Sequence, residues 1–181
     1  MKKNILVGIC GGIAAYKTAE LIRLLVRDGF SVKVVMTEGA THFVGPLTFE
    51  TLTAQKVYLD LWQGNRDGIT HIALTQWAHL CVVAPLSANT LSKVAHGICD
   101  NLLTTVLCAL SKTTKVVLAP AMNHNMWGNP IIKANLKRLK QIKNYIVLDP
   151  PRGVLACGEY GEGRMPDPKD IYKKIKEVSV K

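Results

Sequence analysis

Three short segments in the second half of the chain carry residue types that could bind a ligand and move protons. They are residues 85–90 (PLSANT), 120–127 (PAMNHNMW) and 156–165 (ACGEYGEGRM). Each follows a stretch predicted to be a strand, and an open parallel sheet binds its ligands at the carboxyl ends of its strands. The first segment offers small polar groups, the second an amide among sulfur and indole groups, and the third a thiol among glycines. We therefore interpret the three segments as parts of one site.

Asn123 is the strongest candidate for a ligand-binding side chain. Met122, Met126 and Trp127 flank it, and a group of methionines and tryptophan usually packs in a core. A carboxamide among them needs hydrogen-bond partners. A ligand carboxylate at the edge of the sheet would be one, so we expect Asn123 to bind a ligand.

Cys157 differs from the other cysteines in its surroundings, which are glycines and charged residues. The other four lie in more apolar stretches and are expected to be small core residues. A thiol in a mobile glycine loop is a candidate proton donor or redox partner. Arg164, in the same loop, could bind a phosphate or a carboxylate.

Two predicted strand-to-helix turns could hold a phosphate. Residues 8–13 contain three glycines, which let backbone N–H groups approach an anion at a helix N-terminus. The turn is not a GxGxxG motif, and glycines there often only relieve crowding. Ser87, which begins the second turn, suits a helix N-cap. Alternatively, Ser87, Asn89 and Thr90 bind an anionic or carbonyl-rich ligand such as a flavin, and the residues alone leave both interpretations open.

His71 lies in the apolar segment 69–74, shortly before Trp77. A single histidine in such a segment is more often structural, but its imidazole could also titrate near neutral pH and take a proton from a substrate thiol. The other histidines form no HxxxH or HExxH pair. We expect no metal site.

Composition favours one domain over residues 1–181, since 181 residues with 48% hydrophobic content can bury a sizeable core. The five cysteines form no CxxC pair and their number is odd, which is typical of reduced thiols in the cytoplasm. The net charge of +10 indicates first a solvated basic face, which would also attract phosphorylated substrates in general. No aromatic-studded basic stripe points to nucleic acid, and the apolar run Ile5–Cys10 is too short to cross a membrane.

Buried strand patterns alternate with helical patterns along the chain. This alternation predicts an α/β fold, a three-layer doubly wound parallel sheet of the Rossmann or flavodoxin-like kind. The expected strands are Asn4–Cys10, Ser31–Met36, Val57–Leu59, Leu80–Ala84, Lys115–Ala119 and Tyr145–Leu148. The expected helices are Ala14–Asp28, Thr37–Phe43, Pro46–Thr53, Ser87–His96, Asn101–Leu110, Asn129–Lys140 and Asp170–Glu177.

Together these motifs resemble those of the homo-oligomeric flavin-containing cysteine decarboxylase (flavoprotein) family, over essentially the whole chain. Leu86 departs from the family's motif, which usually has alanine there, and a backbone-binding role would tolerate the change. The resemblance rests on Gly11–Lys17, Met36 and Thr37, the His71 segment with Trp77 and Ala78, Ser87–Thr90, Pro120–Trp127 and Ala156–Met165.

The resemblance implies FMN as the cofactor. It also implies His71 as the base, Asn123 as the ligand of the substrate carboxylate and Cys157 as the acid, with Met122 and Arg164 as further substrate-binding residues. Independently, no acidic residue is clearly placed for an adenosine ribose, so we expect neither FAD nor a nicotinamide. The implied FMN-binding residues are Gly11, Gly12, Ile13, Thr37, Ser87, Ala88, Asn89, Thr90 and Ala121.

The implied reaction is the decarboxylation of 4′-phosphopantothenoylcysteine, a phosphorylated cysteine conjugate, to 4′-phosphopantetheine in coenzyme A biosynthesis. Oxidation of the thiol creates the electron sink that an ordinary cysteine carboxylate lacks, CO2 leaves, and the enethiol is reduced again. Members of the family assemble as trimers or dodecamers with the flavin between subunits. They are often fused to a phosphopantothenate–cysteine ligase, which could otherwise be a separate partner.

Three alternatives stay open. A peptidyl-cysteine decarboxylase of the same family stops at the enethiol and needs no acid, so Cys157 argues against it. A flavin prenyltransferase should lack the 120–127 motif, which is present. A non-catalytic FMN-binding regulatory subunit should carry a long acidic tail, and this sequence has none.

Overall fold

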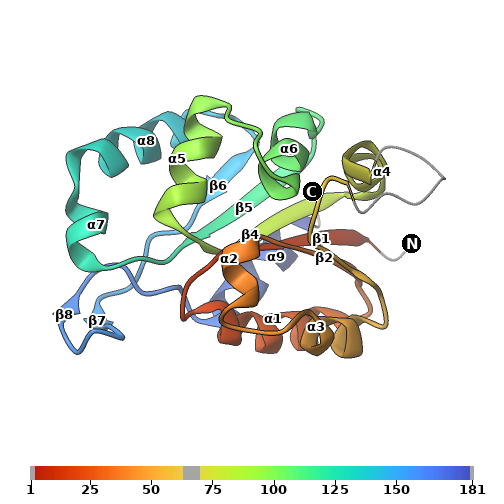
Figure 1. The fold of residues 1–181 in the computed structure, drawn as a ribbon, viewed down its shortest axis with the longest axis horizontal. Helices are drawn as coiled ribbons and strands as arrows, with labels where there is room; N and C mark the ends of the chain where they lie inside the picture. The colour runs from red at the N-terminus through yellow and green to blue at the C-terminus, as the bar shows by residue number, and fades with distance from the viewer. Residues whose placement is uncertain (1–2, 63–69, 180–181) are drawn as a thin grey trace.

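The computed structural model describes residues 3–62 and 70–179. In this part of the chain a six-stranded parallel sheet has the strand order β3-β2-β1-β4-β5-β6 (Figure 1). The chain moves outward from β1 to β3, returns to the centre at β4, and continues outward to β6, which confirms the doubly wound topology. The strands are β1 Asn4–Ile9, β2 Ser31–Met36, β3 Val57–Tyr58, β4 Leu80–Leu86, β5 Lys115–Pro120 and β6 Tyr145–Val147.

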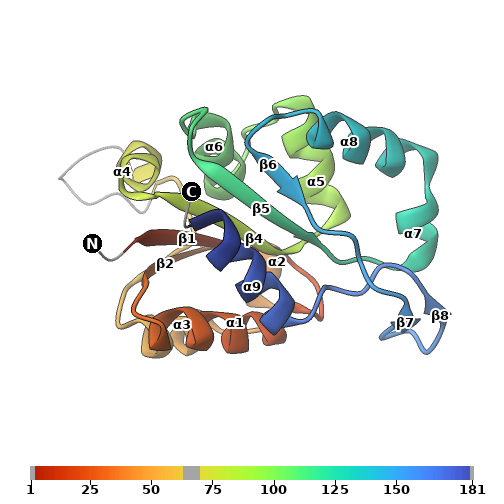
Figure 2. The same cartoon turned by 180° about the vertical axis from the view of Figure 1, so that it is seen from behind.

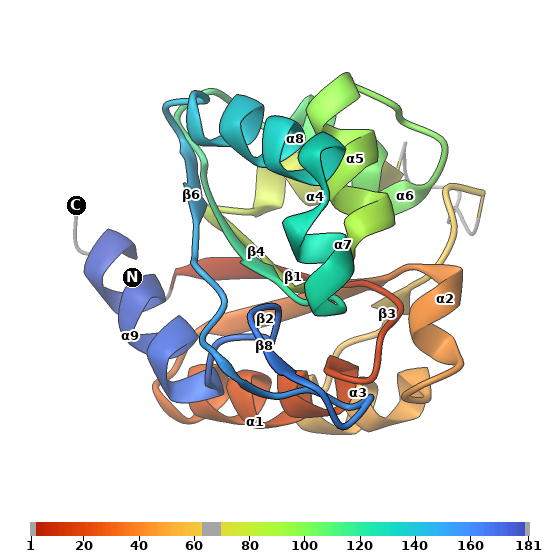
Figure 3. The ribbon, with the colours of Figure 1, turned by 90° about the vertical axis from the view of Figure 1, so that its left-hand side faces the viewer.

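Helices cover both faces of the sheet (Figures 1 and 3). On one face lie α1, α3 and α9, and on the other α4, α5, α6 and α8. None of the described helices is long and apolar enough to cross a membrane. The helices are α1 Ala15–Arg27, α2 Glu38–Thr41, α3 Pro46–Thr53, α4 Thr70–Trp77, α5 Ala88–His96, α6 Leu102–Ala109, α7 His124–Gly128, α8 Pro130–Lys140 and α9 Pro168–Ser179.

Alternation along the central strand divides the core in two. Ile5 and Val7 of β1 pack into the layer of α1, α3 and α9, whereas Leu6 packs into the layer that contains Leu103 of α6. Successive side chains of a strand point to opposite faces of the sheet, and both faces of a parallel sheet are buried. The continuous apolar run that predicted β1 is therefore what a doubly covered strand requires.

Three elements were not predicted. Residues 70–77 form α4, residues 124–128 form α7, and a two-stranded antiparallel sheet pairs β7 (Gly153–Val154) with β8 (Tyr160–Gly161). The loop expected over 156–165 is therefore partly a hairpin. In the apolar segment 69–74, Ile69 lies outside the described residues.

The expectation that four cysteines are core residues holds for two of them. Cys10 and Cys81 are fully buried, and burial raises the pKa of both thiols, to about 12 for Cys81. Cys99 and Cys108 are exposed instead. Apolar neighbours in sequence did not predict burial here, because Cys99 precedes α6 in a connecting loop and Cys108 lies near the end of that helix.

Candidate functional site

A cavity of about 1050 Å³ lies where the chain leaves the carboxyl ends of β1, β2, β4 and β5. Figure 3 looks onto this end of the molecule, where the segments after these strands and the β7–β8 hairpin come together. Parallel strands bring their carboxyl ends to one edge, and the reversal of strand order between β1 and β4 leaves a crevice there. A cavity therefore lies at the edge of the sheet where the sequence predicts the site.

Nearly all of the predicted site residues line this cavity, with His71 as the exception. Lining residues that were not predicted include Lys17, Glu38, Lys93, Asp100 and Asn101. The predicted residues that line it are Gly11, Gly12, Ile13, Thr37, Ser87, Ala88, Asn89, Thr90, Ala121, Met122, Asn123, Cys157 and Arg164.

The two glycines after β1 have different roles. A Cβ atom on Gly11 would lie 2.8 Å from the backbone carbon of Gly39, so Gly11 is required for the close packing of two loops. A Cβ atom on Gly12 would meet nothing within 4 Å. The crowding interpretation therefore applies to Gly11, whereas Gly12 leaves open space beside the cavity.

Ser87 is the N-cap of α5, and its side chain also lines the cavity. Its Oγ accepts a hydrogen bond from the backbone N–H of Thr90 at 3.3 Å. The backbone N–H groups of the first helical turn have no partner within the helix, so those of Ala88 and Asn89 can bind an anion. The cap and the ligand interpretations are compatible, because the cap orders the turn that presents these donors.

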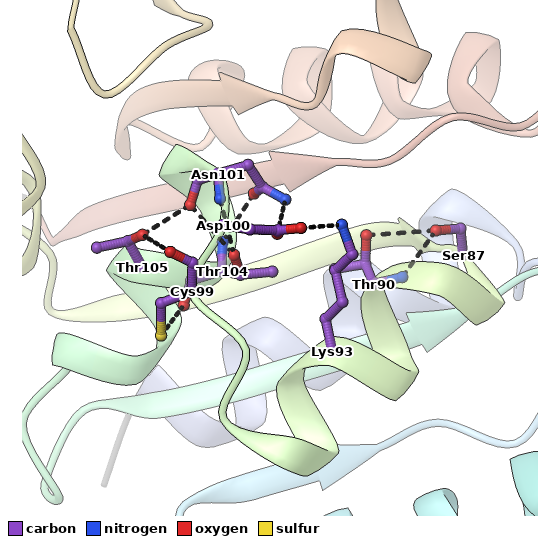
Figure 4. Close-up of polar contacts among 8 residues, drawn as sticks. All are labelled: Ser87, Thr90, Lys93, Cys99, Asp100, Asn101, Thr104 and Thr105. Atoms are coloured by element: carbon purple, nitrogen blue, oxygen red, sulfur yellow. Dashed lines mark hydrogen bonds and ion pairs between the residues drawn. The ribbon is translucent and has the colours of Figure 1, made fainter.

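Lys93 and Asp100 form an ion pair at the wall of the cavity (Figure 4). Lys93 Nζ lies 2.6 Å from Asp100 Oδ2, and this hydrogen bond lowers the pKa of Asp100. Asn101 caps α6 by accepting from the Thr104 N–H at 3.1 Å. Lys93 is thus neutralised within the chain.

Lys17 and Arg164 are the lining cations that can bind an added anion, since neither forms an ion pair within residues 3–62 and 70–179. Lys17 belongs to α1 and Arg164 to the segment after the β7–β8 hairpin. A phosphate or a carboxylate between them would meet charge from two sides of the cavity.

Asn123 and Cys157 meet in space although 34 residues separate them. Asn123 caps α7 with its Oδ1, which accepts from the Asn125 N–H at 2.8 Å. This hydrogen bond assigns the amide orientation and leaves Nδ2 to donate to Cys157 Sγ, at 3.6 Å. The structure therefore brings together the two side chains that the sequence marked separately.

The hairpin that carries Cys157 is ordered by hydrogen bonds. The Leu155 N–H donates to the Glu159 carbonyl at 2.8 Å, and the Gly158 N–H donates to the Leu155 carbonyl at 2.9 Å. Beyond the hairpin, the Met122 N–H donates to the Gly163 carbonyl at 2.9 Å. These bonds join the segment of Cys157 to that of Asn123.

Replacing Gly163 by alanine is expected to separate these two segments. Gly163 has φ 127°, which side chains rarely adopt, and a Cβ there would collide with the Met122 carbonyl oxygen. Strain and the lost hydrogen bond should lower the free energy of unfolding by about 3 kcal/mol. Gly158→Ala is the matched control, because φ is 84° but nothing lies within 4 Å, and it should cost about 1 kcal/mol. Urea denaturation measures both, and equal losses would contradict the role of the Met122 contact.

His71 does not line the cavity of its own chain. It lies on α4, at one end of the long axis of the molecule, whereas α7 and the β7–β8 hairpin lie at the other end (Figures 1 and 2). Within one chain, His71 is therefore placed away from Asn123 and Cys157.

Glu38 bears on the expected choice of cofactor. It begins α2, two residues after the end of β2, and lines the cavity. Dinucleotide-binding folds place the acidic residue that binds an adenosine ribose after this strand. The supposed absence of such a residue therefore gives no argument against FAD or a nicotinamide.

Comparison with known proteins identifies relatives along nearly the whole chain. The Flavoprotein family matches residues 1–179. A probable phosphopantothenoylcysteine decarboxylase of Streptococcus mutans is 42% identical over 178 residues, which cover 98% of this chain and 99% of that protein. The coenzyme A biosynthesis bifunctional protein CoaBC of Borreliella burgdorferi is 44% identical over 173 residues, 96% of this chain and 44% of that protein. The chain thus spans less than half the length of this bifunctional relative.

Solved structures agree with the sequence relatives. A mutant PPC decarboxylase complexed with pantothenoylaminoethenethiol has a TM-score of 0.88 at 34% identity, with 100% of both chains covered. The FMN binding protein AtHal3 has a TM-score of 0.84 at 36% identity, with 98% of this chain and 97% of that chain covered.

Proposed function

The chain belongs to the Flavoprotein family, and from this membership we propose that it decarboxylates 4′-phosphopantothenoylcysteine to 4′-phosphopantetheine in coenzyme A biosynthesis, with FMN as cofactor. The observation that carries the proposal is the cavity that unites the Asn123 amide, the Cys157 thiol and two anion-binding turns. The relative from Streptococcus mutans, matched over almost its full length, supports the same activity.

The lining of the cavity fits FMN. The open space at Gly12 and the free N–H groups at the start of α5 suit a phosphate. Thr37, Asn89 and Ala121 supply polar side chains and backbone groups for the ring system, and AtHal3 supports this choice of cofactor. When bound, FMN supplies a two-electron acceptor for the carbon that carries the substrate thiol.

The side chains of the cavity have separate roles in binding and protonating the substrate. Asn123 Nδ2 donates a hydrogen bond to the substrate carboxylate and orients it, while Met122 offers an apolar contact. Arg164 or Lys17 pairs with the substrate phosphate. After CO2 has left, Cys157 gives a proton to the enethiolate carbon.

The base that takes the proton of the substrate thiol is His71 of a second copy of the chain. This assignment follows from its place outside the cavity of its own chain and requires self-association, as a trimer or as a dodecamer of four trimers. Ile13 and Tyr16 line the cavity with side chains 57% and 59% exposed. Apolar groups at its mouth suit coverage by a second copy.

Two further assignments belong to this proposal. The cysteines of the described residues are all free, which supports a reducing compartment such as the cytoplasm. The bifunctional relatives support a functional link to a phosphopantothenate–cysteine ligase, either as a separate partner or in the same polypeptide.

The alternatives predict different products. A peptidyl-cysteine decarboxylase would release an enethiol, and the contact of Cys157 with Asn123 favours a reaction that continues to a proton transfer. A flavin prenyltransferase would release no CO2 from a cysteine conjugate. A regulatory subunit would bind FMN without turnover.

Purified protein is expected to be yellow, to release FMN on denaturation, and to form CO2 from 4′-phosphopantothenoylcysteine. Chromatography with mass analysis of the released chromophore tests the cofactor, and trapping of CO2 with mass analysis of the thiol product tests the reaction. FAD in the denatured sample, or bound FMN without CO2, would contradict the proposal.

A further inference from the structure

A carboxylate oxygen of Glu159 contacts both Asn123 and Cys157. The proposed function assigns binding of the substrate carboxylate to Asn123 and the final proton transfer to Cys157. Glu159 Oε2 lies 3.2 Å from Cys157 Sγ, which donates to it, and 3.4 Å from Asn123 Nδ2. His124 Nδ1 lies 3.2 Å from the same oxygen. Two donors, Cys157 Sγ and Asn123 Nδ2, and one ion-pair contact, His124 Nδ1, therefore converge on one atom.

His124 acts on Glu159 through charge. Its Nδ1 is within ion-pair distance of Glu159 Oε2 and is buried without a hydrogen-bond partner. A Cβ on Gly161 would lie 2.8 Å from His124 Cβ, which shows how closely β8 packs on this ring. The hydrogen bond from Cys157, followed by the charge of His124, lowers the pKa of Glu159. Glu159 is therefore ionised throughout the neutral range.

We propose that Glu159 is a positioning residue that keeps Cys157 protonated, and its S–H group in place, until CO2 has left the substrate. The proposal rests on the proposed function, in which Cys157 is the acid. A nucleophilic cysteine needs a neighbouring cation to stabilise its thiolate. An ionised carboxylate at 3.2 Å does the opposite, because a thiolate there would place two negative charges side by side.

The proton transfer balances within this arrangement. The S–H bond of Cys157 breaks, its electron pair stays on sulfur, and a C–H bond forms at the enethiolate carbon. The resulting thiolate faces the ionised Glu159, so it takes a proton from water and leaves hydroxide to the buffer. The repulsion between the two anions restores the thiol for the next turnover.

Glu159→Gln removes the charge and keeps the length of the side chain. We expect CO2 to form in the first turnover as in the parent, while the enethiol share of the product rises with pH. This rise should begin at a lower pH than in the parent, because no carboxylate at residue 159 then opposes a negative charge on the neighbouring sulfur. Glu159→Asp keeps the charge and should return the profile toward the parent.

Glu162→Gln is the matched control on the same hairpin segment. Glu162 accepts from Trp127 Nε1 at 3.1 Å and pairs with Arg152 at 3.4 Å, away from Cys157. A glutamine oxygen can still accept from Trp127. The product profile of this variant should match that of the parent.

Alkylation by iodoacetamide supplies a readout that needs no turnover. Peptide mass analysis of the flavin-loaded protein should show Cys157 reacting several-fold faster at neutral pH in Glu159→Gln than in the parent, with exposed Cys99 as an internal reference. If the alkylation rate or the product profile is the same in the two proteins, the proposal for Glu159 fails and the proposed function stands. If the parent itself forms no CO2, the proposed function fails.

Discussion

A mixture of the His71→Asn and Asn123→Asp variants is expected to release CO2, although each variant alone releases none. Asparagine at residue 71 cannot take the thiol proton, so oxidation of the substrate does not begin. Aspartate at residue 123 places a second carboxylate against that of the substrate. Both variants should retain bound flavin. Their flavin content is measured, because loss of the cofactor would also abolish CO2 release.

The recovery follows from the placement of the two residues in one chain. Asn123 lines the cavity and His71 does not. In the proposed arrangement a complete site therefore combines the cavity of one copy with His71 of another. In ring-shaped trimers that contain both variants, about a third of the sites would join an intact Asn123 with an intact His71. The two variants are co-expressed with different tags, purified on both tags in turn, and assayed for CO2.

The matched control mixes Asn123→Asp with Cys157→Ser. Both residues line the cavity of the same chain, so no combination of copies contains both intact side chains in one cavity. Complete product, 4′-phosphopantetheine, should not form in this mixture. If the mixture of His71→Asn and Asn123→Asp also stays inactive, His71 does not act from a second copy.

The fold could be predicted because its strands are buried on both faces. Continuous apolar runs such as Ile5–Ile9 and Leu80–Ala84 are typical of strands that are covered on both faces. Their alternation with helices predicts parallel pairing. Parallel pairing then brings the segments after each strand to one edge. Asn123 and Ser87 could be assigned to one site before any distance between them was known.

The missed elements left weak patterns in the sequence. Within α4 only Leu74 is buried, so the helix shows no apolar stripe. The hairpin has two residues in each strand, and α7 has five residues, which is too short for periodicity. Their positions depend on contacts distant in sequence, such as that between Met122 and Gly163.

The site residues that the sequence did not indicate were missed for a different reason. Glu159 and His124 lie in the motifs next to Cys157 and Asn123, but nothing in their spacing indicates that they meet. Their role depends on the convergence of Cys157, Asn123 and His124 on one carboxylate oxygen, which is a property of the folded hairpin. The role of His71 follows from the resemblance, which does not say which copy of the chain supplies the residue to a given cavity.

Cys157→Ser is expected to divide the proposed reaction into two halves. Oxidation and CO2 loss require the base, Asn123 and the cofactor, so the first turnover should still yield CO2. The final proton transfer should fail, because a serine hydroxyl is a far weaker acid than a thiol with a reference pKa of about 8.5. The variant should therefore release an enethiol in place of 4′-phosphopantetheine.

Anaerobic mixing of Cys157→Ser with substrate measures both halves in one experiment. Flavin absorbance should bleach and stay bleached until oxygen is admitted, and mass analysis should find a product two hydrogen masses lighter than 4′-phosphopantetheine. Cys99→Ser is the control, since Cys99 is exposed and lies outside the cavity lining, and its product should match that of the parent. Normal product from Cys157→Ser would remove the thiol from the mechanism. The reaction would then need another proton donor, and the peptidyl-cysteine decarboxylases could no longer be set aside on the presence of this cysteine.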